Sequence, residues 1–440
     1  MNVKLARTLV FAASLLTAQL PIAAAAQMLV LDKDAEAEAE PDGFVLPYAF
    51  HSDVLDLAFG AVAGKRGILQ PQAGAFLNLI GGTNGSWVGH LYGDGFRTPF
   101  SERLFLGPRI TAGDYAEIDT FQNGNPNFFF DDDRAGSNDS DEDNFIRSEG
   151  TDQWYRMIFK YVLPIGHGRD TIVPTYVLDR GLLHEGSTGG DFWNPLRSGR
   201  TLIEFEPFYR SQDFDADFGS DELETGGARF TLRHENVDFM PNPSKGSIQR
   251  FTLIRDPGVQ DSDSSYTAIE LELSKYFSLG ESERFRKRVL ALNFWTADTP
   301  TWDVDIEDGR RVITHRPPNY FGATLGGLDR LRGFPTARFN DKAAIYYAAE
   351  LRLIPRWNPL GEVAWLKRFV RVDWWQFVPF VELGRVAEHW RLSDLHSDMK
   401  WSAGVGIRAM LESLVIRADV AASSEGMEVQ MMVTHPFPRL

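Results

Sequence analysis

Hydrophobic and polar side chains alternate with a period of two along much of this chain. In Trp401–Ala409 one set of positions holds Trp, Ala, Val and Ile, and the positions between them hold Ser, Gly and Arg. The same alternation runs through Thr201–Arg210, Ala228–Glu235 and Tyr266–Phe277, where the polar positions carry charges of both signs. Successive side chains of a β-strand point to opposite faces, so each segment is expected to have one apolar and one polar surface.

A soluble β-sandwich alternates in the same way, so the period alone does not decide the fold class. The alternating segments here are about ten residues long, whereas strands of soluble proteins average about five or six residues. Tight turns such as Asn242–Gly246 alternate with long polar loops, which is typical of outer-membrane barrels. We therefore predict an all-β fold, a transmembrane antiparallel β-barrel with a long loop folded into its lumen.

The pattern predicts about sixteen strands, an even number, as expected for a closed antiparallel barrel made from one bacterial chain. They cover residues 52–63, 70–82, 84–94, 102–113, 152–163, 170–180, 199–211, 224–236, 247–256, 265–278, 285–296, 344–355, 369–386, 399–410, 413–421 and 427–437. Counting back from the C-terminus puts the connection 114–151 on the periplasmic side, although its length and acidity are typical of an outer loop. This conflict indicates a misassigned strand in the first half.

The N-terminus has the pattern of an export signal. Lys4 and Arg7 precede the apolar run Leu9–Leu20, and Ala24–Ala26 offers a small-residue cleavage site. A membrane anchor is the alternative, but crossing a bilayer takes about twenty apolar residues. We expect a signal peptide at 1–26, a short periplasmic leader at 27–50 and the barrel at 51–440, in the bacterial outer membrane.

Composition narrows the function further. The chain has no cysteine, which excludes disulfides, cysteine lipidation and thiolate metal sites. Aromatic residues make up 12% of the chain, as expected when rings line two membrane–water interfaces. The net charge of −16 argues against a nucleic-acid partner, because phosphate binding needs clustered cations. No cofactor is expected.

Four motifs occur in order in the second half. A glycine-rich stretch leads to the tip Leu331-Arg332-Gly333-Phe334, and the following strand carries Glu350 and Arg352. Pro379–Gly384, Ser402–Arg408 and Arg417–Ala421 follow. From about residue 224 onward these motifs resemble the superfamily of BamA, TamA and the two-partner-secretion transporters, also called the bacterial surface antigen family.

The resemblance implies that the loop 297–343 enters the lumen and that Glu382 is the acidic partner of Arg332. Family members generally have Asp at that position. Glu350, Arg352 and Gly384 are expected to support the pair.

Physical reasoning about the same loop agrees with the resemblance. A loop of this length is too long to be idle in a compact fold. Glu382 faces the lumen by parity, and an Arg–carboxylate pair can be bidentate and charge-assisted. Gly333 is expected to allow a sharp turn at the tip, and Phe334 to pack against the inner wall. The alternative is that Arg332 is a solvated loop residue.

The last strand is expected to place Met427, Val429, Met431, Val433 and Phe437 outward, with His435 at the membrane interface. Its seam with the strand 52–63 is expected to be weakly paired and able to open laterally. The residues between Gln27 and the first expected strand are too few for the periplasmic polypeptide-transport-associated domains of the superfamily. The sequence therefore predicts the short branch of the family, without such domains.

The expected function is a part in outer-membrane biogenesis, by insertion or translocation of protein or lipid. Expected partners are outer-membrane lipid and lipopolysaccharide, with periplasmic proteins or lipoproteins in place of the missing arm. A passive pore or structural barrel is the alternative.

An outer-membrane hydrolase is a third class, but the nine His are scattered and no nucleophile or metal motif accompanies them. His389 and His396 lie near Asp394 and Asp398, where a cation is conceivable but a solvated loop is favoured. The loop Asn123–Asp143 lacks the regular ligand spacing of a calcium loop. Hence we expect neither an enzyme nor a metal site.

Overall fold

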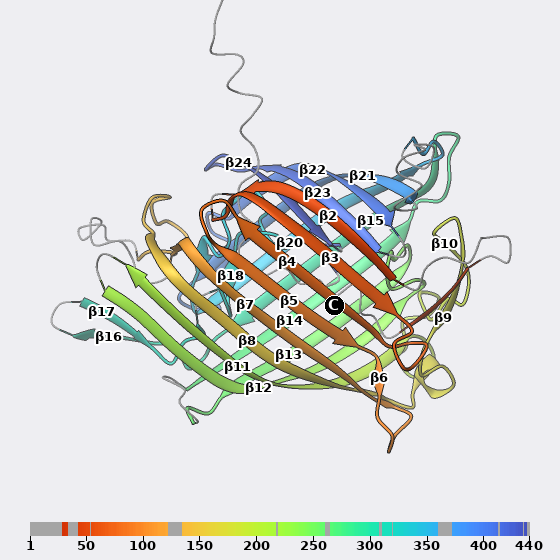
Figure 1. The fold of residues 1–440 in the computed structure, drawn as a ribbon, viewed down its shortest axis with the longest axis horizontal. Coiled ribbons are helices and arrows are strands. Elements are labelled where there is room, and N and C mark those ends of the chain that lie inside the picture. Colours follow the sequence, from red (N-terminus) through yellow and green to blue (C-terminus); the bar gives the residue numbers. More distant parts are fainter. Residues whose placement is uncertain are drawn as a thin grey trace, which may run out of the picture.

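A single large antiparallel sheet forms most of the molecule and closes into a barrel (Figure 1). The computed structural model describes residues 29–33, 43–52, 54–121, 134–216, 219–259, 265–307, 310–318, 320–359, 372–411, 414–433 and 435–437. The signal peptide expected at 1–26 lies outside these residues. No helix among the described residues is long and apolar enough to cross a membrane.

Sixteen strands of the described part pair in succession around the barrel, and the two-residue β6 (Phe96–Arg97) adds a short extension beside β7. They are β2 (Gly43–Ser52), β3 (Asp56–Arg66), β4 (Gly74–Gly82), β5 (Trp87–Asp94), β7 (Leu104–Thr120), β8 (Ile146–Val162), β11 (Arg200–Ala216), β12 (Gly219–Val237), β13 (Gly246–Asp256), β14 (Tyr266–Ser278), β15 (Phe285–Asp298), β20 (Ala343–Pro355), β21 (Val372–Ala387), β22 (Lys400–Leu411), β23 (Leu414–Ala422) and β24 (Met427–Val433). The predicted fold class and strand number are therefore confirmed.

The number is right although two strands were assigned wrongly. β2 extends the barrel into the residues expected to be a leader, so the barrel begins at Gly43 and not at residue 51. Apolar residues are consecutive in β2, and the period of two is hidden there. Residues 170–180 are not a barrel strand; β9 (Thr175–Asp179) joins β1 (Val30–Lys33) and β10 (Leu182–Glu185) in a separate three-stranded sheet. Alternation does not tell which sheet a strand joins.

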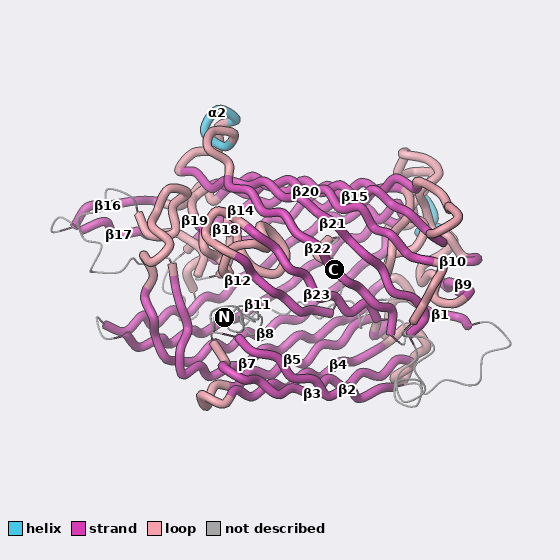
Figure 2. Tube along the Cα trace, turned by 90° about the horizontal axis from the view of Figure 1, so that it is seen from above, coloured by secondary structure: helices cyan, strands magenta, loops and turns pink. Residues whose placement is uncertain are grey.

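Correcting the strands also resolves the conflict over the acidic connection between β7 and β8. Its described part contacts the long connection between β15 and β20: Arg338 donates to the Ser140 hydroxyl at 2.8 Å, and Arg134 lies 3.3 Å from Asp341. The acidic connection therefore lies at the same barrel end as the long loop, as its length and acidity suggest. The sheet of β1, β9 and β10 lies at the opposite end (Figure 2).

The barrel is apolar outside and charged inside. Outward side chains such as Val381 and Ile407 are 57% and 54% exposed, and similar apolar residues occur on most barrel strands. Inward side chains form buried ion pairs, with shortest distances of 2.6 Å for Arg210–Asp152, 2.7 Å for Lys160–Asp94 and 2.6 Å for Arg200–Glu235. A protein in water exposes few contiguous apolar patches of this size, whereas a barrel in lipid needs an apolar outer belt.

The connection from Thr299 to Lys342 has two parts. Its first part forms the hairpin of β16 (Asp303–Glu307) and β17 (Arg310–Thr314), which projects beyond the barrel end in Figures 1 and 2. Its second part enters the lumen and contains the two-residue strands β18 (Thr324–Leu325) and β19 (Phe339–Asn340), which pair with each other. The prediction that the whole of 297–343 enters the lumen is therefore right only for the second part, named the lumen loop below (residues 320–342).

A charge on the outer face tests the lipid exposure of the barrel. The Ile407→Arg variant is expected to lower the free energy of unfolding by about 2–4 kcal/mol in lipid vesicles, because the guanidinium would lie in hydrocarbon. Denaturant titration of vesicle-inserted protein measures this change. Leu196→Arg, in an exposed loop, is the control and should change stability little. Equal stability of both variants and wild type would contradict a lipid-facing Ile407.

Candidate functional site

The tip of the lumen loop is shaped by glycines and a buried aromatic pair. Gly326 and Gly327 have φ angles of +104° and +97°, in the region that favours glycine, and a Cβ at Gly326 would lie 2.1 Å from the Pro335 carbonyl oxygen. Phe334 is fully buried, with its ring centroid 5.0 Å from that of Phe339 in an edge-to-face arrangement. The loop is thereby a tight, packed turn.

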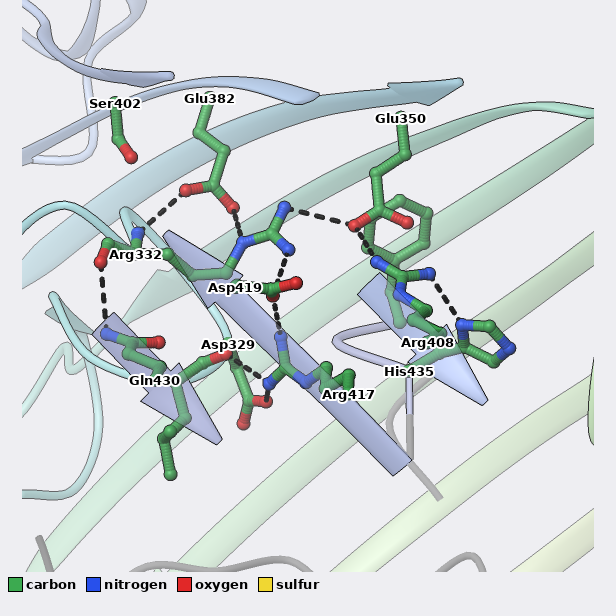
Figure 3. A network of polar contacts seen from close by, with 12 residues as sticks. Asp329, Arg332, Glu350, Glu382, Ser402, Arg408, Arg417, Asp419, Gln430 and His435 are labelled. Atoms are coloured by element: carbon green, nitrogen blue, oxygen red, sulfur yellow. Dashed lines mark hydrogen bonds and ion pairs between the residues drawn. The ribbon is translucent and has the colours of Figure 1, made fainter. Parts of the chain in front are cut away.

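Arg332 lies at this tip and is surrounded by carboxylates. Its Nε donates to Glu382 at 2.9 Å, one terminal nitrogen donates to Asp419 at 2.6 Å, and the other lies 3.0 Å from Glu350 (Figure 3). The main-chain N–H of Arg332 donates to the second oxygen of Glu382 at 2.7 Å. All four side chains are at most 1% exposed, so these charge-assisted hydrogen bonds form away from water.

Each of the last five barrel strands contributes one side chain to the backbone or side chain of Arg332 and Gly333. These are Glu350 of β20, Glu382 of β21, Ser402 of β22, Asp419 of β23 and Gln430 of β24. The Ser402 hydroxyl accepts from the Gly333 N–H at 2.9 Å, and the Gln430 amide donates to the Arg332 carbonyl at 3.0 Å. We call this set the tip clamp. It ties the loop to five consecutive strands.

Two aromatic residues complete the surroundings of Arg332. The Phe380 ring lies 3.4 Å from the guanidinium carbon, a cation–π contact. The Tyr346 hydroxyl donates to Glu382 at 2.6 Å, on the oxygen that also accepts from Arg332 Nε. Glu382 therefore reaches both the main chain and the side chain of Arg332, one oxygen to each.

Three further arginines extend the clamp. Glu350 accepts from Arg408 at 2.6 Å and pairs with Arg352 at 2.8 Å. Arg417 donates to Asp419 at 2.7 Å. The same Asp419 oxygen accepts from Arg332 at 2.6 Å. The buried network holds four arginines and four carboxylates, which are Arg332, Arg352, Arg408, Arg417, Asp329, Glu350, Glu382 and Asp419. Its formal charge is balanced, as buried charges require.

This arrangement shifts the pKa values of Arg332 and His435, which lie outside the barrel strands. Burial alone would lower the pKa of Arg332, but Glu382, Asp419 and Glu350 outweigh it and raise the pKa well above its ordinary value. Burial, with nearby arginines, lowers the pKa of His435 well below its ordinary value. His435 is therefore neutral and its Nδ1 can accept from Arg408, 2.6 Å away.

The structure brings all the predicted site residues together, and the chain turns sharply at the tip as predicted, with the Phe334 N–H donating to the Leu331 carbonyl at 3.0 Å. Gly333 does not have a left-handed backbone; Leu331 does, with φ of +50°. A Cβ at Gly333 would lie 2.8 Å from the backbone of Ala422, so glycine is needed for close approach to β23. Gly384 similarly leaves room for the Leu331 side chain, 3.2 Å from where its Cβ would be.

Several members of the network were not singled out from the sequence. Asp419, Arg417 and Arg408 lie within two of the motifs, and strand parity puts them on the lumen side. Two other predictions are wrong. His435, expected at the membrane interface, is 3% exposed and contacts Arg408; Phe437, expected to face outward, is 1% exposed and its carbonyl accepts from Arg352 at 3.0 Å. The chain turns inward after β24, which ends the alternation.

The arrangement offers charge pairing between arginines and carboxylates. In the part of the chain that the structure describes, no group of three or more His, Cys, Asp or Glu side chains is placed to hold a metal ion. His396, one of the loop histidines considered for a cation, receives its Nε2 contact from the Tyr347 hydroxyl at 2.9 Å. Residues 123–133 of the acidic loop lie outside the described residues.

Known structures share this architecture. CdiB from Escherichia coli matches over 90% of this chain and 63% of its own, with a TM-score of 0.53 and 11% sequence identity. CdiB from Acinetobacter baumannii matches over 90% of this chain and 60% of its own (TM-score 0.48, 10% identity). BamA from Haemophilus ducreyi lacking POTRA domains 1–3 matches over 90% of this chain and 71% of its own (TM-score 0.48, 14% identity).

No protein-family model and no curated protein sequence matches the chain. The chain spans about six tenths of the length of the two CdiB chains. At these identities the likeness to Escherichia coli CdiB shows a common fold: the protein is an antiparallel β-barrel of the same architecture.

Removing the central guanidinium should destabilise the protein strongly. The Arg332→Ala variant leaves three buried carboxylates without their shared partner, at a cost of about 3–5 kcal/mol. Thermal unfolding in detergent and protease sensitivity of residues 320–342 measure the effect. The control is Arg356→Ala, whose ion pair with Glu281 is exposed and is worth at most about 1 kcal/mol. Equal melting temperatures for the two variants would contradict the clamp.

Close approach at Gly333 gives a second prediction. The Gly333→Ala variant should lose about 1–3 kcal/mol, because the added methyl meets backbone atoms that have little room to move. Gly81→Ala, where a Cβ would meet nothing within 4 Å, is the matched control and should unfold as wild type does. The comparison uses denaturant midpoints in the same detergent; an unaffected Gly333→Ala protein would show that the tip is loosely seated.

Proposed function

We propose that this protein is a bacterial outer-membrane barrel of the BamA/TamA-like superfamily, which takes part in inserting or translocating protein or lipid. The observation that carries the proposal is the tip clamp, in which one loop arginine is bound by carboxylates of three barrel strands, with Ser402 and Gln430 supplying the contacts of two more. Four ordered sequence motifs support the superfamily, since they contain Arg332 and every clamp residue except Gln430.

The outer membrane is the proposed location. Exposed Phe, Leu, Ile and Val side chains on the outward face match a lipid environment. A bacterial barrel of this kind needs export, and the N-terminal pattern of Lys4, Arg7 and Ala24–Ala26 fits a cleaved signal. Outer-membrane lipid and lipopolysaccharide are the proposed surroundings, and periplasmic proteins or lipoproteins the proposed partners.

The clamp connects the state of the loop to the C-terminal side of the barrel. Gln430, on β24, holds the Arg332 carbonyl, and β24 is the shortest of the sixteen barrel strands described, with seven residues. A short strand offers few backbone hydrogen bonds to its neighbours, so less free energy opposes its separation. In the proposal, movement of β24 breaks the Gln430 contact and loosens the loop. β3, which covers most of the predicted strand 52–63, pairs with β2 on one side and with β4 on the other.

A passive pore is the weaker alternative, because the lumen loop fills the space that a pore would leave open. Leu331, Phe334 and Phe339 of this loop are fully buried against the inner wall and one another. A plugged lumen conducts in small, brief openings, whereas a pore gives large, stable ones.

Planar-bilayer conductance tests whether the lumen loop plugs the barrel. Wild-type protein is expected to show small, brief openings, and Arg332→Ala protein larger and longer ones, because the loop is no longer held. Arg356→Ala, at an exposed ion pair, should conduct as wild type does. Large, stable openings in wild type would favour the passive pore.

The biogenesis role has its own readout. Cells that lack the protein should contain less outer-membrane protein or lipopolysaccharide, and a plasmid copy of the wild-type chain should restore the content. Unchanged amounts of both in the deletion strain would overturn the biogenesis role while leaving the barrel and its location intact.

A further inference from the structure

A second charged region lies in the lumen beside the buried network of the tip clamp, and Asp329 belongs to both. It lines a cavity of about 170 Å³ between the lumen loop and the wall formed by β5, β7, β8 and β11 to β14. Seven of its lining side chains are cationic and four are anionic. Unlike the tip clamp, this region has an excess of positive charge.

Most of the cations around the cavity have a carboxylate close by. Lys160 lies 2.7 Å from Asp94, Arg233 lies 2.8 Å from Glu204, and Arg229 lies 3.5 Å from Glu206. Asp94 does not line the cavity, and neither does Glu272, which lies 2.7 Å from Arg250, so these two carboxylates offset part of the excess.

Arg109 and Arg156 are different. They are direct partners in the register of β7 and β8, and both line the cavity. Among the described residues neither takes part in a salt bridge, and the Nε of Arg156 is buried without a hydrogen-bond partner. Arg156 is attracted by Glu206 but repelled by both Arg109 and Arg229. Like charges directly opposite each other destabilise a strand pair, so this arrangement needs compensation.

Aromatic rings lie against three guanidiniums of the cavity; that of Arg109 lies 5.9 Å from the Tyr92 ring centroid. The guanidinium carbon of Arg156 lies 3.5 Å from the Trp154 ring centroid, and that of Arg229 lies 5.0 Å from the Phe321 ring centroid. The two rings meet edge to face, with centroids 5.3 Å apart. A guanidinium stacked on a ring keeps its N–H edge available for a ligand. Phe321 belongs to the lumen loop, so the loop forms part of this site.

We propose that this cavity binds a phosphate-type oxyanion, held by Arg109 and Arg156 with Arg229 beside them. A planar guanidinium donates two parallel hydrogen bonds to a tetrahedral oxyanion, which a spherical chloride ion cannot accept. A water molecule occupies about 30 Å³ in the liquid, so 170 Å³ holds an oxyanion and several waters. The anion supplies the negative charge that the facing arginines lack. The proposal does not depend on the function proposed above.

Inorganic phosphate is the first probe. The detergent-solubilised full chain is titrated with phosphate by calorimetry, and its melting temperature is followed against chloride at matched ionic strength. Wild type should bind saturably and melt at higher temperature in phosphate. The double variant R109Q/R156Q should bind at least ten-fold more weakly, because each lost charge-assisted hydrogen bond to an anion costs about ten-fold or more.

Two further variants separate the loss of the binding site from a general loss of positive charge or of folding. Arg66→Gln removes the same charge from β3, away from the cavity, and should bind phosphate as wild type does. Arg156→Lys keeps the charge but lacks the fork, and should bind with intermediate affinity even if the double variant fails to fold. The proposal would be overturned if wild type does not bind phosphate. It would also be overturned if wild type, Arg156→Lys and R109Q/R156Q all bind phosphate equally well.

Glycerol 3-phosphate distinguishes the source of the oxyanion. If it competes with inorganic phosphate, the site accepts a phosphate group carried by a larger molecule. If only inorganic phosphate binds, the site takes the free ion. Both outcomes support an oxyanion site, and they separate its two sources.

Discussion

One buried guanidinium determines how the interior of this barrel is organised. Arg332 enters the lumen on a loop and finds carboxylates of Glu350, Glu382 and Asp419 within 3.0 Å. A charge taken out of water is costly unless opposite charges and hydrogen bonds surround it. The loop therefore has one position in which the arginine meets all three carboxylates, and the strands that carry them must be in register for that position to exist.

The two faces of the barrel wall differ for the same reason, because a charged or polar group needs a partner wherever water is excluded. Outside, strand residues such as Ile407 are apolar because lipid cannot hydrogen-bond to them. Inside, charges of both signs are paired across neighbouring strands, as in Arg210 with Asp152. The cationic cavity departs from this pairing, which is why it stands out as a site for an added anion.

Much of this architecture was predictable from the sequence because the period of two is a local property. The same parity placed Glu382 inside, and the motif around Arg332 gave its partner. What was missed depends on tertiary context. Asp419 shares a partner with Glu382 only because β21 and β23 curve around one tip, and no spacing along the chain records that curvature. His435 and Phe437 turn inward after the last strand, where the alternation no longer applies.

The Gln430 contact also has a consequence for the order of folding. The residues that hold Arg332 are supplied from positions 350 to 430, so the final contact closes a segment of nearly one hundred residues. Loops of that size close late, after local hairpins have formed. The plug therefore acquires its full set of bonds only when the C-terminal strand has joined the sheet, and a chain cut short before that strand keeps an arginine whose carbonyl lacks its donor.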